Sequence, residues 1–266
     1  SAKYAYVLKS NPAIQLIHGR AQVHDAQTLV VTQADGKQLE IAADRFLIAT
    51  GRTPIVPGLS GLADTPFWTS TEALVAQQLP EHLIVLGGSV VALELGQAFL
   101  RLGSKVTLLS RSRLLPREDA QLGTAMKQIL TDEGMHVITD CKVESVRHKN
   151  QQFEIETAHR RLYSDRLLVA TGRRPNTSGL GLKNANVALD NSGAVMIDEH
   201  MRTNVANIFA AGDCTNQPQF VYVAAAAGTR RRSQLYGSGL VSAGDNQRAA
   251  LHRRRRAFRH KRGSGA

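Results

Sequence analysis

A glycine-rich turn between an apolar run and an amphipathic run is the part of this sequence best suited to bind a ligand. Residues 83–86 are apolar, and Gly87, Ser89 and Ala92 follow with the spacing G-x-S-x-x-A. In a Rossmann unit, small residues at this spacing permit a tight turn, close approach of the backbone to a pyrophosphate, and close packing of helix on strand. The next run, residues 90–102, has helical spacing and ends at a glycine, so its first amides would face the phosphates. The spacing predicts a dinucleotide-binding strand-helix-strand unit.

The residues after the second strand of this unit indicate which nucleotide it would bind. The strand expected at 105–109 is followed by Arg111, Arg113 and Arg117, and no acid occurs before Glu118. A site for NADH usually has Asp or Glu here to bind the ribose hydroxyls. A carboxylate would repel the 2′-phosphate of NADPH, whereas guanidinium groups pair with a phosphate bidentately. The arginines therefore favour NADPH, and the alternative is a solvated arginine loop.

An eleven-residue phrase occurs twice in the chain. Residues 44–54 and 165–175 are identical at eight of eleven positions. Each copy is an apolar run that ends at Ala-Thr-Gly, with Gly51 and Gly172 as the two glycines. Such a run is typical of a buried strand that ends in a tight turn. Because the glycine-rich turn lies between the copies, the repeat predicts two related nucleotide-binding units.

Together these motifs resemble the flavoprotein pyridine nucleotide-disulphide oxidoreductases. Residues 203–213, which read Thr-x-x-x-x-Ile-Phe-Ala-Ala-Gly-Asp, add to the resemblance. Within that family, residues 68–74, 89–94 and 212–229 are similar to the mercuric reductases, and the resemblance runs over about 2–230. It implies an α/β fold of the two-dinucleotide-binding-domain flavoprotein type, with a Rossmann-like NADPH domain inserted in a partial FAD domain.

The resemblance also implies roles for individual residues. It places FAD contacts at Ala21, Gly51, Gly212, Asp213 and Val221, and NADPH contacts at Gly87, Ser89, Ala92, Arg111, Arg113, Arg117 and Gly172. Asp213 would accept hydrogen bonds from hydroxyls of FAD, the backbone N–H of Val221 would face the flavin ring, and Glu94 would lie near the nicotinamide and flavin. The alternatives are a helix N-cap for Asp213 and simple strand packing for Ala21.

The sequence lacks two other motifs of the family, the Cys-x-x-x-x-Cys pair and an earlier G-x-G-x-x-G. Its two cysteines, Cys141 and Cys214, are 73 positions apart, which is neither a redox nor a metal-binding spacing. Cys214 is expected to be a buried structural thiol. No catalytic cysteine and no metal site is therefore predicted.

Composition and motifs together predict the organisation of the chain. An FAD-binding segment is expected at 1–67, the NADPH-binding domain at 68–186, the FAD-binding return segment at 187–229, and a basic tail at 230–266. The tail has ten arginines and one lysine against one acid, so it carries almost all of the formal net charge of +11. Such a composition cannot offset the entropy of ordering, which predicts a disordered tail. A nucleic-acid-binding arm and a change of reading frame are the two explanations considered for it, with the second favoured.

Hydrophobic periodicity predicts the secondary structure around these motifs. Strands are expected at 14–18, 22–23, 28–32, 38–41, 46–50, 136–138, 142–147, 153–157, 167–171, 195–197 and 208–210, and further helices at 69–78 and 122–133. No run approaches the roughly 18 apolar residues of a membrane helix. With no targeting signal visible, the cytoplasm is the expected location.

The function expected from the resemblance is NADPH-dependent, FAD-containing reduction of Hg(II) to Hg(0) by a homodimer. Because the cysteine pair and the interface domain are missing, we expect this chain alone to be inactive. Two alternatives remain open. One is another flavin disulphide reductase, of the dihydrolipoamide or glutathione type. The other is a non-catalytic nucleotide-binding remnant whose tail binds polyanions.

Overall fold

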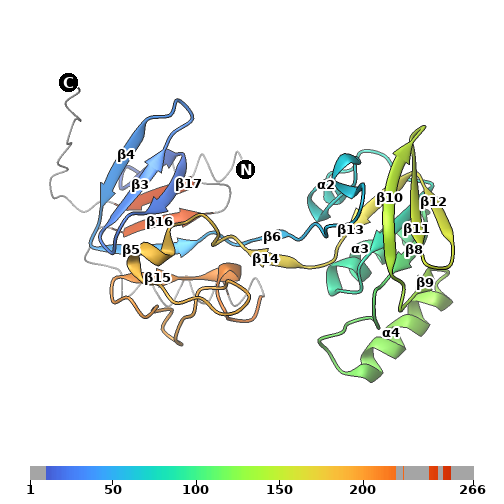
Figure 1. The fold of residues 1–266 in the computed structure, drawn as a ribbon. Helices are drawn as coiled ribbons and strands as arrows, with labels where there is room; N and C mark the ends of the chain where they lie inside the picture. The colour runs from blue at the N-terminus through green and yellow to red at the C-terminus, as the bar shows by residue number, and fades with distance from the viewer. Residues whose placement is uncertain (1–9, 220–223, 225–239, 245–247, 253–266) are drawn as a thin grey trace. The chain divides into compact units, whose positions relative to one another are not determined.

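The chain forms two compact units, which the computed structural model describes over residues 10–219, 224, 240–244 and 248–252 (Figure 1). Unit 1 comprises Ser1–Thr53 and Arg174–Ala266, and unit 2 comprises Pro54–Arg173. The sequence placed the boundaries later, after 67 and 186. The difference has a packing cause, because Leu62 lies in a core of unit 2 and Leu182 lies in the core of unit 1.

Unit 2 is built on a four-stranded parallel sheet. Its strands, in spatial order, are β13 (Arg166–Val169), β7 (His82–Leu86), β8 (Lys105–Leu109) and β9 (His136–Ile138). Helix α3 (Val90–Arg101) joins β7 to β8, and α4 (Ala120–Asp132) joins β8 to β9. The expected dinucleotide-binding topology is therefore present, and α3 stops where the sequence predicts, with Gly103 at a φ of 108°.

Both faces of the parallel sheet are covered. Leu83 and Val85 of β7 pack into the cluster that holds α3, whereas Ile84 and Leu86 pack with Phe153 in the cluster under the second sheet. That second sheet is antiparallel and consists of β10 (Val143–Lys149), β11 (Gln152–Thr157) and β12 (Arg161–Ser164). A strand buried on both faces needs a continuous apolar run, which explains the sequence of β7.

Short elements complete unit 2. They are the 3-10 helix η1 (Leu62–Asp64) and helix α2 (Ser70–Leu74), where Thr69 and Glu72 form a capping box. Helix α2 ends at Leu74, before the expected 78, with Val75 as its C-cap. Trp68, the only tryptophan, exchanges backbone hydrogen bonds with β13, and the Arg166 guanidinium lies 5.6 Å from its ring centroid.

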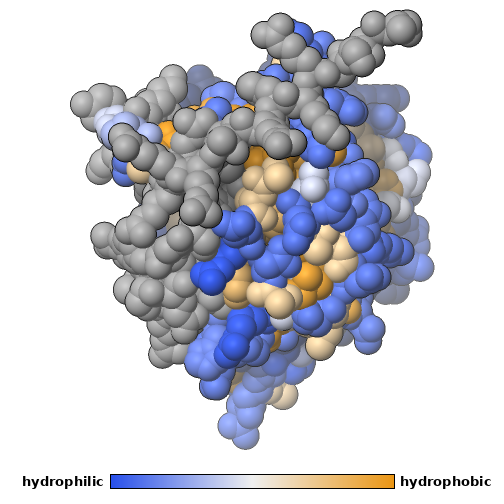
Figure 2. Space-filling view, turned by 90° about the vertical axis from the view of Figure 1, so that its left-hand side faces the viewer, coloured by the Kyte–Doolittle hydropathy of each residue, from blue (hydrophilic) through white to orange (hydrophobic). Residues whose placement is uncertain are grey.

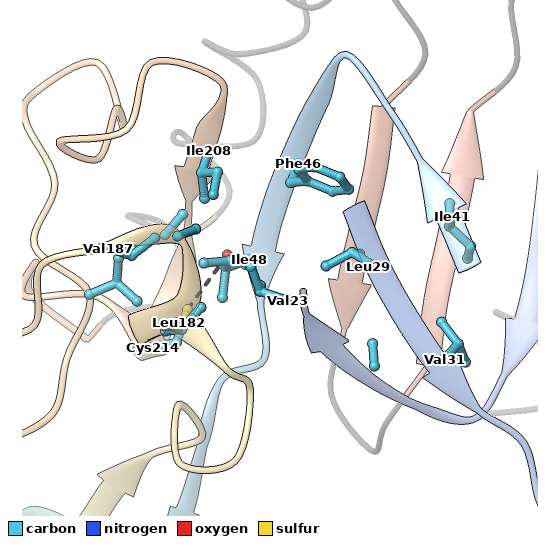
Figure 3. Close-up of a cluster of buried hydrophobic side chains, with 14 of the residues drawn as sticks. Val23, Leu29, Val31, Ile41, Phe46, Ile48, Leu182, Val187, Ile208 and Cys214 are labelled. Atoms are coloured by element: carbon cyan, nitrogen blue, oxygen red, sulfur yellow. Dashed lines mark hydrogen bonds between the residues drawn. The ribbon is translucent and has the colours of Figure 1, made fainter. Parts of the chain in front are cut away.

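Unit 1 contains two sheets around one apolar core. The five-stranded sheet has the order β1 (Ile14–His18), β17 (Arg248–His252), β16 (Leu240–Gly244), β5 (Arg45–Ala49) and β15 (Ile208–Ala210). The three-stranded sheet consists of β2 (Arg20–Val23), β3 (Thr28–Thr32) and β4 (Gln38–Ala42). Side chains from both sheets and from the 3-10 helix η2 (Leu182–Ala185) meet in the core, as Figure 3 shows for Leu29, Ile48 and Leu182. On the face shown in Figure 2, the described surface is mostly hydrophilic with small apolar patches.

The structure differs from two expectations of secondary structure in unit 1. Residues 195–197 form only isolated bridges, from Val195 to Leu189 and to Thr215, so the strand expected there was wrong. Conversely, β16 and β17 lie inside the stretch expected to be a disordered tail. The basic runs dominate the composition of that stretch, but residues 240–244 are small or apolar and pair in parallel with β5.

The chain passes between the units twice, at β6 (Arg52–Pro54) and β14 (Arg173–Pro175), and these two short strands pair. They are the ends of the two copies of the repeated phrase. Among the described residues, every helix is too short or too polar to cross a membrane.

Candidate functional site

The glycine turn after β7 is closely surrounded by backbone. Gly87 has a φ of 138°, and a Cβ added to it would lie 2.2 Å from the carbonyl oxygen of Ala170. A Cβ added to Gly88 would lie 2.4 Å from the Ser110 hydroxyl. Only glycine therefore fits at Gly87 without a shift of backbone. Gly88, which the sequence motif left unassigned, is the second position where a side chain would collide.

The start of α3 leaves its backbone amides open. Ser89 is the N-cap residue, but its hydroxyl donates to the Ala170 carbonyl at 3.0 Å and does not cap the helix. The first amides of a helix lack partners inside the helix, and here they lack the side-chain cap as well. Ala92 is fully buried among the residues that join α3 to the sheet. This turn has the geometry that a pyrophosphate needs, so the residues present fit a dinucleotide.

The glycine turn lies where the order of the sheet reverses. Strand β7 has β13 on one side and β8 on the other, and Gly87 and Gly172 follow the carboxyl ends of β7 and β13. Ligands of open α/β sheets bind in the crevice at such a point. Gly172 has a φ of 141°, and an added Cβ would meet only the Ile55 side chain, at 3.6 Å. Glu94 is exposed on the second turn of α3.

The three arginines after β8 do not behave alike. In the part of the chain that the structure describes, the exposed side chains of Arg111 and Arg117 make no hydrogen bond or ion pair. Arg113 instead donates to four backbone carbonyls of its own loop. The structure thus leaves two of the three arginines available for a phosphate, whereas the sequence predicted all three.

The Gly-Asp turn after β15 lies at the carboxyl end of the parallel strands β5 and β15 in unit 1. Strands β5 and β15 are parallel neighbours, so Gly51 and Gly212, with φ values of 67° and 76°, lie at the same edge of the sheet. Asp213 is half-buried inside the 3-10 helix η3 (Gly212–Cys214), whose N-cap is Ala211, so the alternative of an N-cap role for Asp213 was wrong.

Asp213 is held through its backbone and free at its carboxylate. Nε of Arg52 donates to the carbonyl oxygen of Asp213 at 2.7 Å. Among the described residues the Asp213 carboxylate has no hydrogen-bond partner, and a Cβ on Gly212 would meet only Ala224, at 3.9 Å. A fixed, open carboxylate suits the hydroxyls of a flavin dinucleotide, so the residues present fit FAD.

Two other expected FAD contacts have different outcomes. Ala21 is buried in β2 and packs in the core of unit 1, as the alternative of simple strand packing describes. Val221 lies outside the described residues. Thr50, which the sequence motif left unassigned, is buried beside Gly51, and its hydroxyl has no hydrogen-bond partner.

Both cysteines are unpaired thiols. Cys214 is fully buried and its Sγ lies 3.3 Å from the Ala211 carbonyl oxygen, which confirms the expected buried thiol. Burial raises the pKa of Cys214, although the nearby backbone of Thr50 and Gly51 acts to lower it. Burial also raises the pKa of Cys141. Because the thiolate is the reactive form, neither cysteine is activated as a nucleophile.

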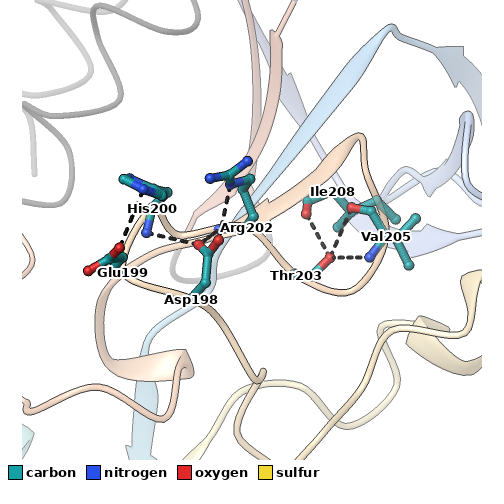
Figure 4. A network of polar contacts seen from close by, with 7 residues as sticks. All are labelled: Asp198, Glu199, His200, Arg202, Thr203, Val205 and Ile208. Atoms are coloured by element: carbon teal, nitrogen blue, oxygen red, sulfur yellow. Dashed lines mark hydrogen bonds and ion pairs between the residues drawn. The ribbon is translucent and has the colours of Figure 1, made fainter.

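A compact polar loop leads into β15 (Figure 4). Although burial opposes it, hydrogen bonds from the amides of Arg202 and His200 lower the pKa of Asp198, which also accepts from Nε of Arg202 at 3.0 Å. The Thr203 hydroxyl donates to the Ile208 carbonyl at 2.7 Å. These bonds fix where β15 begins, and therefore where its Gly-Asp turn lies.

Comparison with known proteins gives a family and several relatives. The family model described as pyridine nucleotide-disulphide oxidoreductase matches residues 1–228. A mercuric reductase of Acidithiobacillus ferrooxidans is 51% identical over 89% of this chain and 43% of its own length. A mercuric reductase of Shigella flexneri is 52% identical, again over 89% of this chain and 43% of its own length.

A different relative provides a solved structure. The probable pyridine nucleotide-disulfide oxidoreductase RclA of Escherichia coli is 36% identical over 90% of this chain and 55% of its own length. A Cu(II) complex of RclA, titled an HOCl-induced flavoprotein disulfide reductase, superposes with a TM-score of 0.80 at 34% identity, over 88% of this chain and 54% of that one. The chain thus spans about half the length of the relatives it matches.

Proposed function

The chain belongs to the pyridine nucleotide-disulphide oxidoreductase family, and from that premise we propose that it is the NADPH-binding unit and part of the FAD-binding unit of a mercuric reductase. The glycine turn at the reversal point of the parallel sheet carries the proposal of a dinucleotide site. Identities of 50–52% to three mercuric reductases, against 36% to RclA, support the more specific assignment.

Each element of the site has a role in this proposal. When bound, the nicotinamide cofactor supplies a hydride and FAD passes the electrons on. Gly87 admits the pyrophosphate, the amides of α3 bind it, and Arg111 and Arg117 pair with the 2′-phosphate. Asp213 accepts hydrogen bonds from FAD hydroxyls, and Glu94 lies toward the nicotinamide.

The proposed substrate is Hg(II), a soft metal that thiolates bind well. The chain has only two thiols, which lie in different units, and burial raises the pKa of both. We therefore propose that this chain alone does not reduce mercury. For the longer enzyme that it resembles, we propose a homodimer, and the unpaired cysteines suit a cytoplasmic location.

The test is a pair of measurements on the chain as it stands. Titration with NADPH and with NADH, followed by nucleotide fluorescence, should show saturable binding that is tighter for NADPH. NADPH oxidation with added FAD and Hg(II) should not exceed the rate without Hg(II). Failure to bind NADPH contradicts the cofactor assignment, and rapid mercury-dependent oxidation contradicts the proposed inactivity.

A second candidate is another flavin disulphide reductase, which the similarity to RclA favours. Both candidates predict a dinucleotide site at Gly87, so they differ only in the substrate.

The remaining alternative, a non-catalytic remnant with a polyanion-binding tail, predicts salt-sensitive binding of heparin that is lost when residues 230–266 are removed. Retention of heparin binding after that truncation would exclude the tail as the binding segment.

A further inference from the structure

We infer that Arg113 is a positioning residue, which favours NADPH by holding the loop after β8 in place and not by binding the 2′-phosphate. The inference rests on the proposed function, because it concerns how this chain selects NADPH. It follows from the contacts of the Arg113 guanidinium with its own loop and from the contacts of that loop with the glycine turn.

The guanidinium of Arg113 is occupied by backbone oxygens. Its Nη1 donates to the carbonyls of Leu115 and Asp119 at 3.1 and 3.4 Å, and its Nη2 donates to those of Pro116 and Glu118 at 3.1 and 2.7 Å. These bonds use both terminal nitrogens, which are the groups that form a bidentate pair with a phosphate. A phosphate at Arg113 would have to displace them. The Leu115 and Asp119 carbonyls would keep the backbone amides of Glu118 and Gly123 as donors, but those of Pro116 and Glu118 would lose theirs.

The loop that Arg113 holds is docked on the glycine turn. Leu115 has a φ of 48°, and its amide donates to the Gly88 carbonyl at 2.8 Å. Leu114 and Leu115 are buried in the cluster that holds α3. The pyrophosphate-binding turn and the arginine loop are therefore one connected structure.

The loop is also packed closely against α4. A Cβ added to Gly123 would lie 2.4 Å from the Leu114 carbonyl oxygen and 3.4 Å from Nη1 of Arg113. Asp119, whose carbonyl Arg113 holds, caps α4 through the amide of Gln121 at 2.7 Å. We call the four hydrogen bonds from the Arg113 guanidinium to these carbonyls the Arg113 clamp. The clamp joins the end of β8 to the start of α4.

Of the two arginines left for the phosphate, Arg111 precedes Arg113 and Arg117 lies between two of the residues whose carbonyls Arg113 binds. Arg111 and Arg117 are exposed, and neither has a hydrogen-bond or ion-pair partner within the described residues. A loop that is ordered before binding spares the ligand the cost of ordering it. Ordering a single backbone residue costs roughly a factor of five to thirty in affinity, so loss of the clamp should weaken phosphate recognition measurably.

Substitution of Arg113 by lysine can distinguish a residue that holds the loop from one that binds the phosphate directly. Arg113→Lys keeps the positive charge but cannot reach four carbonyls with a planar fork. If Arg113 acts as a clamp, the Arg113→Lys substitution should loosen the loop, whereas a charge that merely attracts the phosphate would survive the change. Arg111→Gln is the matched control, because it removes a phosphate contact and leaves the clamp in place.

A second variant disturbs the loop and keeps all three arginines. Gly123→Ala pushes a methyl group against the Leu114 carbonyl without changing any charge. Only a positioning effect can then weaken NADPH binding. This variant also tests the inference should the Arg113→Lys chain fail to fold.

The experiment combines hydrogen exchange of the nucleotide-free chain with nucleotide titrations. In Arg113→Lys and in Gly123→Ala, amide exchange in residues 111–119 should rise about tenfold or more, because local opening becomes easier. NADPH affinity should fall about tenfold more than NADH affinity, because both nucleotides use the turn but only NADPH uses the arginines that the loop positions. Arg111→Gln should lower NADPH affinity at least as much, by about ten- to a hundredfold, without faster exchange.

The outcomes separate this inference from the proposed function. Unchanged exchange in both loop variants, or faster exchange with full NADPH affinity and selectivity, overturns the positioning role of Arg113. If the unaltered chain binds no NADPH, the proposed function fails and the selectivity role fails with it. The exchange measurement then still shows whether Arg113 holds the loop.

Discussion

At the scale of single residues, the function of an arginine here depends on which oxygens lie within its reach. Arg111 and Arg113 are two positions apart, yet one projects free and the other binds four carbonyls of its own chain. An exposed charge interacts weakly with its surroundings because water and salt screen it. A free arginine beside a nucleotide turn therefore acts mainly through direct contact with the ligand.

Arg111→Glu should accordingly weaken NADPH binding and spare NADH. Loss of a charge-assisted phosphate contact costs roughly 1.5–3 kcal/mol, and the new carboxylate adds repulsion. Fluorescence titration with both nucleotides measures the difference. Lys149→Glu, on the exposed surface of β10, makes the same change of charge away from the turn and should leave both affinities unchanged. Equal losses for the two nucleotides in Arg111→Glu would show that Arg111 does not contact the 2′-phosphate.

The buried thiol of Cys214 predicts a dependence of stability on alkaline pH. Burial raises its pKa above the ordinary value of 9.0, so the unfolded chain releases this proton at a lower pH than the folded chain. The stabilisation is complete below the unfolded pKa and is lost as pH rises through the folded pKa. Relative to Cys214→Ala, the unaltered chain should lose up to about 1.4 kcal/mol per pH unit in that window. Urea unfolding at pH 8 to 10.5 measures this, and parallel curves for the two chains would contradict it.

At this scale the motifs predicted which residues form the glycine turn and the arginine loop. They did not predict which arginine stays free and which one binds its own loop. Gly87, Ser89 and Ala92 were predictable because the turn needs small residues at fixed spacing. The clamp by Arg113 was not, since it depends on a left-handed Leu115 and on the path of the loop between β8 and α4. The FAD contact expected at Ala21 stays a prediction, because its side chain is buried in the core of unit 1 and a resemblance does not show which atoms of a residue face a ligand.

At the scale of elements, strands formed by short apolar runs were the most predictable. Strands β5 and β13 come from the repeated phrase, and each is followed by a glycine with positive φ and by a short strand, β6 or β14. The pairing of β16 with β5 was harder to predict. It depends on a free edge of the sheet, which does not change the hydrophobic period of residues 240–244.

Two glycine-to-alanine substitutions in unit 2 should distinguish the stability cost of backbone strain from the cost of a clash between the new methyl group and a neighbouring atom. Gly103 has a φ of 108° and nothing near its missing side chain, so Gly103→Ala should cost about 1–2 kcal/mol of stability. Gly87→Ala adds a collision with the Ala170 carbonyl to similar strain, and should cost roughly 3 kcal/mol or more. Denaturant unfolding compares the two variants, and equal losses would mean that the turn moves away from Ala170 at little cost.

At the scale of the whole molecule, one unit is continuous in sequence and the other is interrupted. Unit 2 runs without a break from Pro54 to Arg173 and has two buried clusters of its own, whereas unit 1 draws its core from both sides of that insertion. The sequence indicated this insertion through the two copies of one phrase. It placed the boundaries after 67 and 186, whereas the compact units divide after 53 and 173, where no change of composition marks the division.

The segment 54–173 should therefore fold alone and bind NADPH about as well as the full chain. All proposed NADPH contacts, the Arg113 clamp and both covering layers of the parallel sheet lie within it. Circular dichroism should show one cooperative unfolding transition, and titration should give the same preference for NADPH over NADH. A segment that folds but binds no nucleotide would indicate that residues of unit 1 complete the site.

Because Trp68 packs against β13, its fluorescence can report nucleotide binding to unit 2. Because this is the only tryptophan, excitation of indole observes unit 2 alone, whatever unit 1 does. Indole emission overlaps the near-ultraviolet absorption band of a reduced nicotinamide, so NADPH bound in the same unit should quench Trp68 and emit blue light in its place. Stopped-flow recording of that energy transfer would give association and release rates of the nucleotide without any label.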